Sequence, residues 1–165
     1  YQTSTEKRPI DPDVYLLRGR LYFDNGQHRE ALVDFKHAML LDPTRLDLLV
    51  EFAKTLQKMR KHEEAVAYLE EILQRDPRNP SAHYLLGNIA MENEHRKLAE
   101  QHLKHAIKEG GANFPDAHVK LGYLYKDKGL TALSCDSFKQ YLRVAPKNAA
   151  DREDVMRTIS RMCRR

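Results

Sequence analysis

Small and apolar residues recur along the chain at a fixed spacing. The steps between Gly19, Ala53, Gly87 and Gly122 are 34, 34 and 35 residues. Two further positions keep the same steps: Ala31, Ala65, Ala99 and Ser134, each followed four residues later by Phe35, Leu69, Leu103 and Phe138. Small residues let two helices cross closely, and a large apolar residue fills the space between them. The pattern predicts four units of about 34 residues, each made of two short antiparallel helices.

Proline and glycine mark the breaks between these helices. Pro43 and Pro77 are 34 residues apart, Pro146 follows 69 residues later, and Gly111 stands where the third unit would have its proline. Proline cannot continue the preceding helix, and the glycines of Asn25-Gly26 and Lys128-Gly129 allow left-handed turns. The predicted helices cover residues 12–24, 28–41, 46–59, 62–75, 80–93, 96–109, 115–127 and 131–144.

The two ends of the chain differ from the repeats. Residues 1–11 are polar and proline-containing and predict an irregular lead-in. A ninth helix is predicted at about 149–163, within a terminal segment of residues 149–165. Its apolar stripe is Val155, Met156, Ile159 and Met162. A stacked array needs a polar-faced end, so we interpret this segment as a C-terminal capping helix.

The residues at these positions resemble the tetratricopeptide repeat family, whose pattern is W-x2-L-G-x2-Y, then A-x3-F, then A, then P. The first unit matches with Tyr15, Gly19, Tyr22, Ala31, Phe35, Ala38 and Pro43, and the other three match in register. Arg18 departs from the leucine that the family prefers. The resemblance implies an all-α solenoid of antiparallel helix pairs wound into a superhelix, with four repeats over 12–148 (12–45, 46–79, 80–114 and 115–148).

The family's binding groove implies a set of ligand-contacting positions. Carried onto this chain, they are Leu16, Arg20, Phe23, Val50, Lys54, Gln57, Tyr84, Asn88, Met91, Val119, Tyr123 and Lys126. The set holds three basic residues and no acidic one, whereas the expected rim is mainly acidic and includes Asp13, Asp24, Asp47, Glu51, Glu92, Asp116 and Asp127. We expect a peptide or protein ligand with apolar anchors and acidic groups. Asn88 is expected to bind the ligand's backbone, because an amide both donates and accepts.

One known ligand class of the family is not expected. Members that bind the C-terminal carboxylate of heat-shock chaperones use Lys, Asn, Asn, Lys and Arg at set groove positions. Starting from repeat one, the corresponding residues are Leu16, Arg20, Glu51, Ser81 and Leu85, and starting from repeat two they are Val50, Lys54, Leu85, Asp116 and Lys120. Only Lys120 keeps the expected charge, so chaperone tail binding is disfavoured.

Composition excludes several other classes. The chain of 165 residues carries 28 Lys and Arg against 24 Asp and Glu, a surplus too small to predict nucleic-acid binding. No apolar run approaches the roughly 20 residues that a membrane helix needs. The two cysteines, Cys135 and Cys163, are too few for a disulfide framework, and no motif beside them indicates a nucleophile. The arginines around Cys163 would lower its thiol pKa and make it somewhat reactive, but a structural or incidental role is expected for both cysteines.

Two further clusters have simpler explanations than ligand binding. His102 and His105, with His95 upstream, could share a metal, but no other ligand completes a site, so we expect a solvated helix face. His83 and His118 are expected to be half-buried packing residues. The basic tail of Arg157, Arg161, Arg164 and Arg165 is interpreted as a charged cap. No cofactor or metal is expected.

Two function classes remain open. The first is a non-catalytic protein–protein interaction scaffold or adaptor that binds a peptide segment of its partner. The second is a repeat domain or subunit of a larger assembly or regulated enzyme, such as a bacterial pilus, secretion or motility assembly. An intrinsic enzyme is not expected, because nothing supplies a paired acid and base. A cytoplasmic location is expected, with a periplasmic or membrane-associated one, after removal of a signal, as the alternative.

Overall fold

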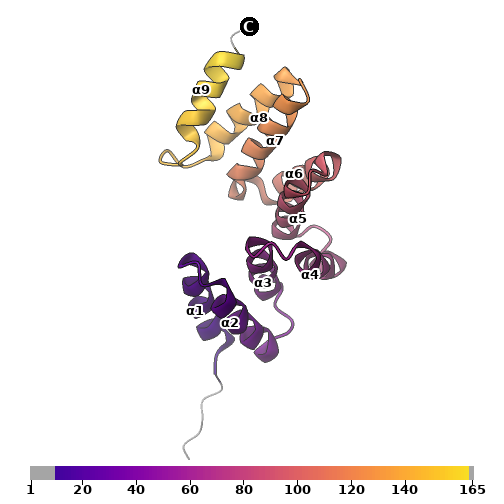
Figure 1. Cartoon of the computed structure of the whole chain (residues 1–165), viewed down its shortest axis with the longest axis vertical. Coiled ribbons are helices and arrows are strands. Elements are labelled where there is room, and N and C mark those ends of the chain that lie inside the picture. The colour runs from indigo at the N-terminus through magenta and orange to yellow at the C-terminus, as the bar shows by residue number, and fades with distance from the viewer. Residues whose placement is uncertain (1–9, 164–165) are drawn as a thin grey trace, which may run out of the picture. The chain divides into compact units, whose positions relative to one another are not determined.

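The computed structural model describes residues 10–163, and all regular structure in that range is helical. Antiparallel helices follow one another along the chain, as predicted (Figure 1). The α-helices are α1 Pro12–Asp24, α2 His28–Leu41, α3 Leu46–Lys58, α4 His62–Arg75, α5 Pro80–Glu92, α6 Arg96–Gly110, α7 Pro115–Asp127, α8 Thr131–Val144 and α9 Arg152–Met162, with a short 3₁₀ helix η1 at Gly111–Asn113. The predicted all-α solenoid of helix pairs is confirmed. Of the expected lead-in, only Ile10 and Asp11 lie within the described residues, and the Asp11 carboxylate caps α1 by accepting from the Asp13 N–H.

The chain divides into two compact units, residues 1–72 and 73–165. In the first unit, α1 and α2 pack side by side and α3 packs on α2. Their shared core consists of Leu16, Ala31, Phe35, Ala38 and Leu48. Ala31 and Phe35 are positions that repeat every 34 residues, and Leu16 and Ala38 lie one turn from such positions, so the repeat period and most of the core coincide.

The second unit has two core clusters. One joins α5, α6 and α7 through Ala90, Ala99, Leu103, Ala117, Leu121, Leu124 and Tyr125. The other joins α7, α8 and α9 through Val119, Phe138, Tyr141, Ala145 and Val155. Because Val155 of α9 is fully buried in this second cluster, α9 covers the apolar side of α8, as a cap should.

In three of the helix pairs, a glycine of the first helix faces a large residue of the second. A Cβ added to Gly19 would lie 2.6 Å from Phe35 Cε1, and one added to Gly122 would lie 2.5 Å from Phe138 Cε1. In the third repeat, a Cβ on Gly87 would approach Leu103 Cδ2 to 2.9 Å. Glycine is therefore required at these crossings for space and not for backbone conformation.

An ion pair explains why Arg18 replaces the leucine of the family pattern. The Arg18 Nε and Nη2 atoms donate to the two carboxylate oxygens of Asp34 on α2, both at 2.7 Å. Asp34 is only 2% exposed, so its charge needs this bidentate partner. The neighbouring carboxylate raises the pKa of Arg18 further above its usual range. At the corresponding positions of repeat two, the rings of Phe52 and Tyr68 form an edge-to-face contact, with their centroids 4.9 Å apart.

The third repeat ends differently from the others, because it has no proline there. Gly111 adopts a left-handed φ of 55°, and η1 forms one extra turn before α7. The ring of Phe114 lies against Gly110, where an added Cβ would come within 2.4 Å of it. Gly110 thus leaves space for the Phe114 ring, and Gly111 adopts the positive φ that the turn needs. The repeat pattern did not predict this 3₁₀ helix.

The C-terminal region also differs from expectation. Helix α9 begins at Arg152 rather than near 149, because the chain after Pro146 first forms turns closed by the Ala149 N–H to Pro146 O and the Arg152 N–H to Ala149 O hydrogen bonds. Cys135 of α8 and Cys163 are joined by a disulfide. The expectation of a reactive Cys163 thiol is therefore wrong, since neither sulfur is free.

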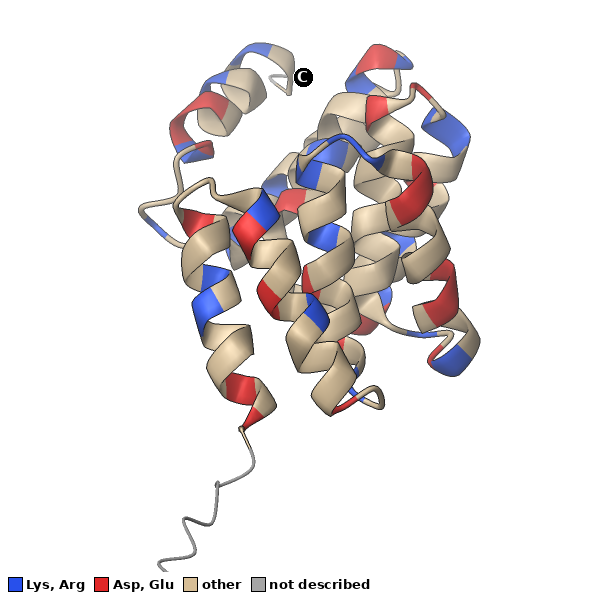
Figure 2. Ribbon diagram, turned by 60° about the horizontal axis from the view of Figure 1, so that its bottom comes forward, with Lys and Arg blue, Asp and Glu red and all other residues tan. Residues whose placement is uncertain are grey.

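Charges of both signs are spread over the helices (Figure 2). Glu100 of α6 forms one linked group with α7: it accepts from Lys104 Nζ and Lys128 Nζ, both at 2.6 Å, and from the Tyr125 hydroxyl at 3.1 Å. The two ammonium groups lower the pKa of Glu100 to about 2. Among residues 10–163, no helix combines the length and the apolar character that crossing a membrane requires.

The crossing of α7 and α8 generates a stability prediction. Gly122→Ala should lower the free energy of unfolding by about 1–3 kcal/mol, because the new methyl group overlaps the Phe138 ring. In a Phe138→Leu background the same change should cost less, because repeat two already has Ala53 and Leu69 at these positions. Urea unfolding of the four proteins gives the coupling energy. Additive effects of the two substitutions would contradict the proposed crossing.

Candidate functional site

The first unit gathers charges on the exposed faces of α1 and α3. Arg20 Nε donates to Glu51 Oε1 at 2.8 Å, and Lys54 Nζ lies 3.5 Å from the other oxygen of that carboxylate. The Lys54 ammonium also lies 4.5 Å from the centroid of the Phe23 ring, within cation–π range. Two cations and one mostly buried carboxylate thus form a group with a net positive charge.

Glu51 was expected on the acidic rim, but it lies between two residues of the expected groove floor. Helical spacing within α3 alone could not show this, because the position depends on Arg20 of α1. The cue in the sequence was the (i, i+3) spacing of Glu51 and Lys54, which favours an ion pair on one helix face.

The other expected contact residues of the first unit are less accessible. Leu16 belongs to the core cluster, and Gln57 is buried. Val50 is half-buried on α3. Only Arg20, Phe23 and Lys54 of this half therefore present a charge or a ring to a ligand.

In the second unit, Asn88 of α5 is the most unusual of the expected residues. Its side chain is 8% exposed, and its Oδ1 atom accepts no hydrogen bond within the chain. Burial raises the pKa of Tyr84, which lies one turn earlier. A hydrogen bond from Asn88 lowers this pKa, and the negative charge of Asp116 raises it further. Asn88 thus uses its amide on Tyr84 and keeps an unpaired carbonyl oxygen.

Helix α7 contributes an aromatic and basic pair to the second unit. Tyr123 is exposed, its ring contacts Phe138 edge-on at 5.0 Å, and Lys126 Nζ lies 5.9 Å from its centroid. Val119 instead belongs to a core cluster, and Met91 of α5 is half-buried against the other cluster.

A pocket of about 290 Å³ adjoins Lys126 in the second unit. Its lining is Lys126 of α7 together with Thr158, Arg161 and Met162 of α9. Arg161 was interpreted only as part of a charged cap, but the fold brings it to the same pocket as Lys126. The repeat pattern could not predict this, because α9 lies outside the repeats. Arg164 and Arg165 of the expected basic tail lie outside the described residues.

The histidines of α5 and α6 form a contact cluster. His83 is buried, its ring stacks on His105 at 4.8 Å, and its Nδ1 lies 3.0 Å from His102 Nδ1. Because the Pro77 carbonyl accepts from His83 Nε2, His83 Nδ1 is the acceptor for the His102 N–H. The packing role of His83 is confirmed, whereas His102 is half-buried instead of solvated. In residues 10–163, no three His, Cys, Asp or Glu side chains are arranged to hold a metal ion.

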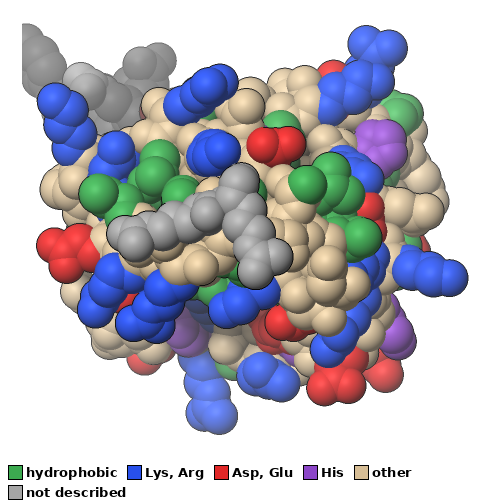
Figure 3. Space-filling view, turned by 90° about the horizontal axis from the view of Figure 1, so that it is seen from above, with side chains coloured by type: hydrophobic (Ala, Val, Ile, Leu, Met, Phe, Trp, Pro, Cys, Tyr) green, Lys and Arg blue, Asp and Glu red, His purple; other side chains and the backbone are tan. Residues whose placement is uncertain are grey.

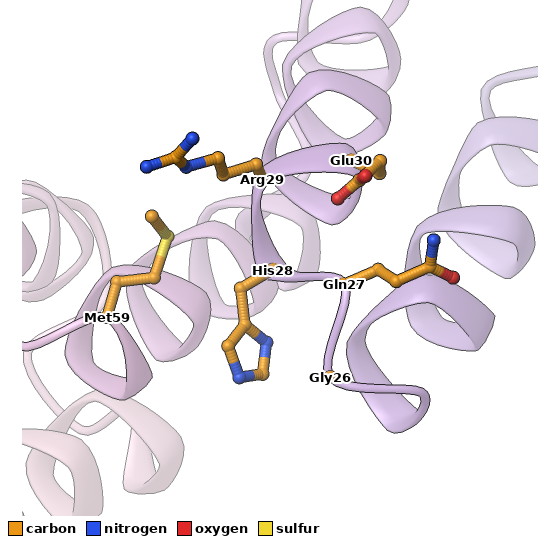
Figure 4. Close-up of a pocket in the computed structure, with 6 residues that line it drawn as sticks. All are labelled: Gly26, Gln27, His28, Arg29, Glu30 and Met59. Carbon is orange, nitrogen blue, oxygen red and sulfur yellow. The ribbon is translucent and has the colours of Figure 1, made fainter.

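A larger pocket, of about 420 Å³, lies in the first unit at the turn between α1 and α2. Gly26, Gln27, His28, Arg29, Glu30 and Met59 line it (Figure 4). The side chains of Gln27 and Glu30 lie on the opposite side of the backbone from Met59, whereas Arg29 extends to the same side as Met59 (Figure 4). Basic and acidic side chains are interspersed on the face seen in Figure 3, without one continuous field of either sign.

Sequence comparison assigns the family. Two profiles, both described as tetratricopeptide repeat, match the chain, one over residues 56–121 and the other over residues 12–45 and 115–148. The chain belongs to the tetratricopeptide repeat family. No curated protein sequence matches it.

Solved structures agree with this assignment. PilF of Pseudomonas aeruginosa is 21% identical with a TM-score of 0.76, over 91% of this chain and 69% of that one. PilW, described as a widely conserved type IV pilus biogenesis factor, is 20% identical with a TM-score of 0.75, over 92% and 70%. YrrB, described as a TPR protein with an unusual peptide-binding site, is 15% identical with a TM-score of 0.65, over 90% and 74%. At these identities the likeness shows the fold.

The histidine cluster predicts a pH dependence of stability. Burial and the neighbouring His83 and His105 lower the pKa of His102, and burial lowers that of His118. Just below the ordinary histidine pKa, the unfolded chain therefore binds more protons than the folded chain. The free energy of unfolding is thus highest above about pH 6.5 and decreases as the pH falls toward the lowered pKa values of the folded state.

We expect the thermal midpoint to fall by a few degrees between pH 7.5 and 5.5. His102→Gln should reduce this fall, whereas substitution of the exposed His37 by Gln should not. Differential scanning calorimetry across the pH range measures the slope. An unchanged slope in His102→Gln would show that the cluster does not carry the effect.

Proposed function

We propose that this protein is a non-catalytic adaptor that binds an extended or helical peptide segment of a partner, with candidate contact residues on α1 and α3 in the first unit and on α5 and α7 in the second. Tetratricopeptide repeats are in general interaction modules without catalytic activity. The observation that carries the specific proposal is the buried, unpaired carbonyl oxygen of Asn88.

A buried polar atom without a partner lowers stability by about 1–3 kcal/mol, and most such atoms in folded proteins have a partner. Asn88 lies on the helix face that also presents Tyr84 and Met91, because residues four and three apart share a face. A backbone N–H of a bound peptide would satisfy the Asn88 carbonyl. The ligand would thereby recover a hydrogen bond that the free protein lacks.

The charged groups favour a peptide with acidic side chains. In the second unit, Lys126 and Arg161 share one pocket beside the exposed ring of Tyr123. In the first unit, Arg20 and Lys54 share a single carboxylate, which leaves one positive charge uncompensated. Tyr84, Tyr123 and Phe23 supply apolar contact area for the anchors of such a peptide. We therefore propose Arg20, Phe23, Lys54, Tyr84, Asn88, Tyr123, Lys126 and Arg161 as the contact residues.

The second candidate function is a subunit role in a larger assembly, such as a pilus, secretion or motility apparatus. It is supported by the fold likeness to PilF and to the pilus biogenesis factor PilW. The two candidates differ in which surface holds the partner, so the experiment below also separates them.

Loss of groove contacts should remove the partner. We expect Asn88→Ala combined with Tyr123→Ala to weaken partner capture about tenfold or more, because it removes the backbone contact and an exposed aromatic anchor. The thermal midpoint should fall by no more than a few degrees, since Asn88 Oδ1 is unpaired and Tyr123 lies at the surface with one ring contact, to Phe138. Affinity capture from native lysate, with quantitative mass spectrometry of both proteins, measures this.

A matched control is Lys36→Ala with Leu40→Ala, which changes two exposed residues of α2. This variant should capture the same partner as the wild type. A partner that the Asn88 and Tyr123 variant retains at full level would move the binding surface elsewhere and favour the assembly role.

We also propose an oxidising compartment outside the cytoplasm, which was the alternative at the sequence level. The disulfide between Cys135 and Cys163 supports it, because structural disulfides persist in the periplasm or outside the cell and are rare in the cytosol. In protein taken from its native cells under acid quench, a maleimide mass tag should modify neither cysteine before reduction and both after it. Full modification before reduction would instead favour the cytoplasm.

A further inference from the structure

Helix α1 carries an exposed apolar stripe that no part of the described chain covers. Val14, Leu17 and Leu21 are 57%, 61% and 63% exposed, and Ile10 just before the helix is 59% exposed. Spacings of three and four residues place the three helical members on one face. A contiguous stripe of this kind differs from single exposed apolar residues, which are ordinary, and marks an interaction surface.

At two of the three helical positions of the stripe, the corresponding residues of the other repeats are buried. By the repeat spacing, Val14 corresponds to Leu48, Ala82 and Ala117, and Leu21 corresponds to Thr55, Ile89 and Leu124, all six of them buried. Leu17 corresponds to Glu51, Leu85 and Lys120, of which only Leu85 is buried. Leu48 packs with Phe35 and Ala38 of α2, the helix before it. Ala117 and Leu124 pack with Leu103 of α6, again the helix before them. The stripe on α1 is therefore the surface on which this fold places another helix.

Covering the stripe requires an amphipathic helix with several large apolar residues on one face.

The charges beside the stripe indicate which helix fits. Its N-terminal half is flanked by Asp11 and Asp13, and its C-terminal half by Arg18 and Arg20, all exposed. Each of three of these residues forms an ion pair within the chain: Asp13 with Arg45, Arg18 with Asp34, and Arg20 with Glu51. The side chains of Asp13, Arg18 and Arg20 stay exposed to solvent in these pairs. If a second copy of α1 lay antiparallel to the first, the acidic half of each copy would face the basic half of the other. The dipoles of the two helices would also point in opposite directions, which is the favourable arrangement. A parallel copy would place like charges together.

We propose that α1 pairs with α1 of a second copy of this chain, antiparallel, through Ile10, Val14, Leu17 and Leu21. The contact is isologous, because the same residues face each other across a two-fold axis. One helix pair buries less than the area of a standard interface, so the dimer dissociates in the micromolar range or above. This inference does not rest on the proposed peptide binding, and its variants leave Asn88 and Tyr123 unchanged.

Sedimentation-velocity ultracentrifugation of the full chain from about 1 µM to 1 mM tests the pairing. The wild type should shift from monomer to dimer, and Leu17→Glu should raise the dissociation constant about tenfold or more, because it places charges at the centre of the contact. Leu40→Glu is the matched control, since Leu40 is 73% exposed but lies on α2, away from the stripe. A wild type that stays monomeric, or a dimer that Leu17→Glu leaves intact, would overturn the proposal.

A second variant tests the antiparallel arrangement and does not depend on the apolar residues. Asp13→Lys puts a positive charge opposite the basic half of the partner helix, so it should weaken the dimer, more so at low salt. Glu70→Lys makes the same charge change at an exposed site on α4 and should leave the dimer unchanged. Equal dissociation constants for the two variants would overturn the antiparallel pairing.

Discussion

The close crossing of the two helices within each pair is the constraint on which the rest of the structure depends. At Gly19 and Gly122 the crossing leaves no room even for a methyl group, because Phe35 and Phe138 occupy that space. The buried side of each first helix is fully used by this contact. On α1 and α7, other sides of the helix stay exposed and present Arg20 and Tyr123. The packing of the core and the composition of the candidate site are two sides of the same helices.

Electrostatics then determines how the exposed sides differ between the two units. In the first unit, Glu51 partly neutralises Arg20 and Lys54, so this half holds its cations in place even without a ligand. In the second unit, Lys126 and Arg161 share a pocket, and Asn88 keeps an unpaired carbonyl oxygen. The second unit thus offers a ligand both cationic groups and a buried carbonyl oxygen that accepts no hydrogen bond.

Much of the fold could be predicted from the sequence, because core positions repeat with the same period as the helix pairs. The first eight helices and the packing of His83 follow from that period. The 3₁₀ turn at Gly111–Asn113, the late start of α9 and the bond between Cys135 and Cys163 do not, because they lie at or beyond the irregular positions. For the candidate site, the family resemblance proposed Tyr123 and Asn88, and both stay predictions. It could not place Glu51 or Arg161, whose positions depend on contacts between different helices.

The ion pair between Arg18 and Asp34 limits which helices can be exchanged between repeats. Repeat two uses a ring contact between Phe52 and Tyr68 at the same two positions. A recombination event that joined α1 to α4, or α3 to α2, would therefore pair a guanidinium with a phenol ring, or leave a carboxylate buried beside a phenyl ring. Exchange of whole helix pairs keeps both partners together. Joining α3 to α2 is the costly exchange, because it leaves the Asp34 carboxylate buried without a cation.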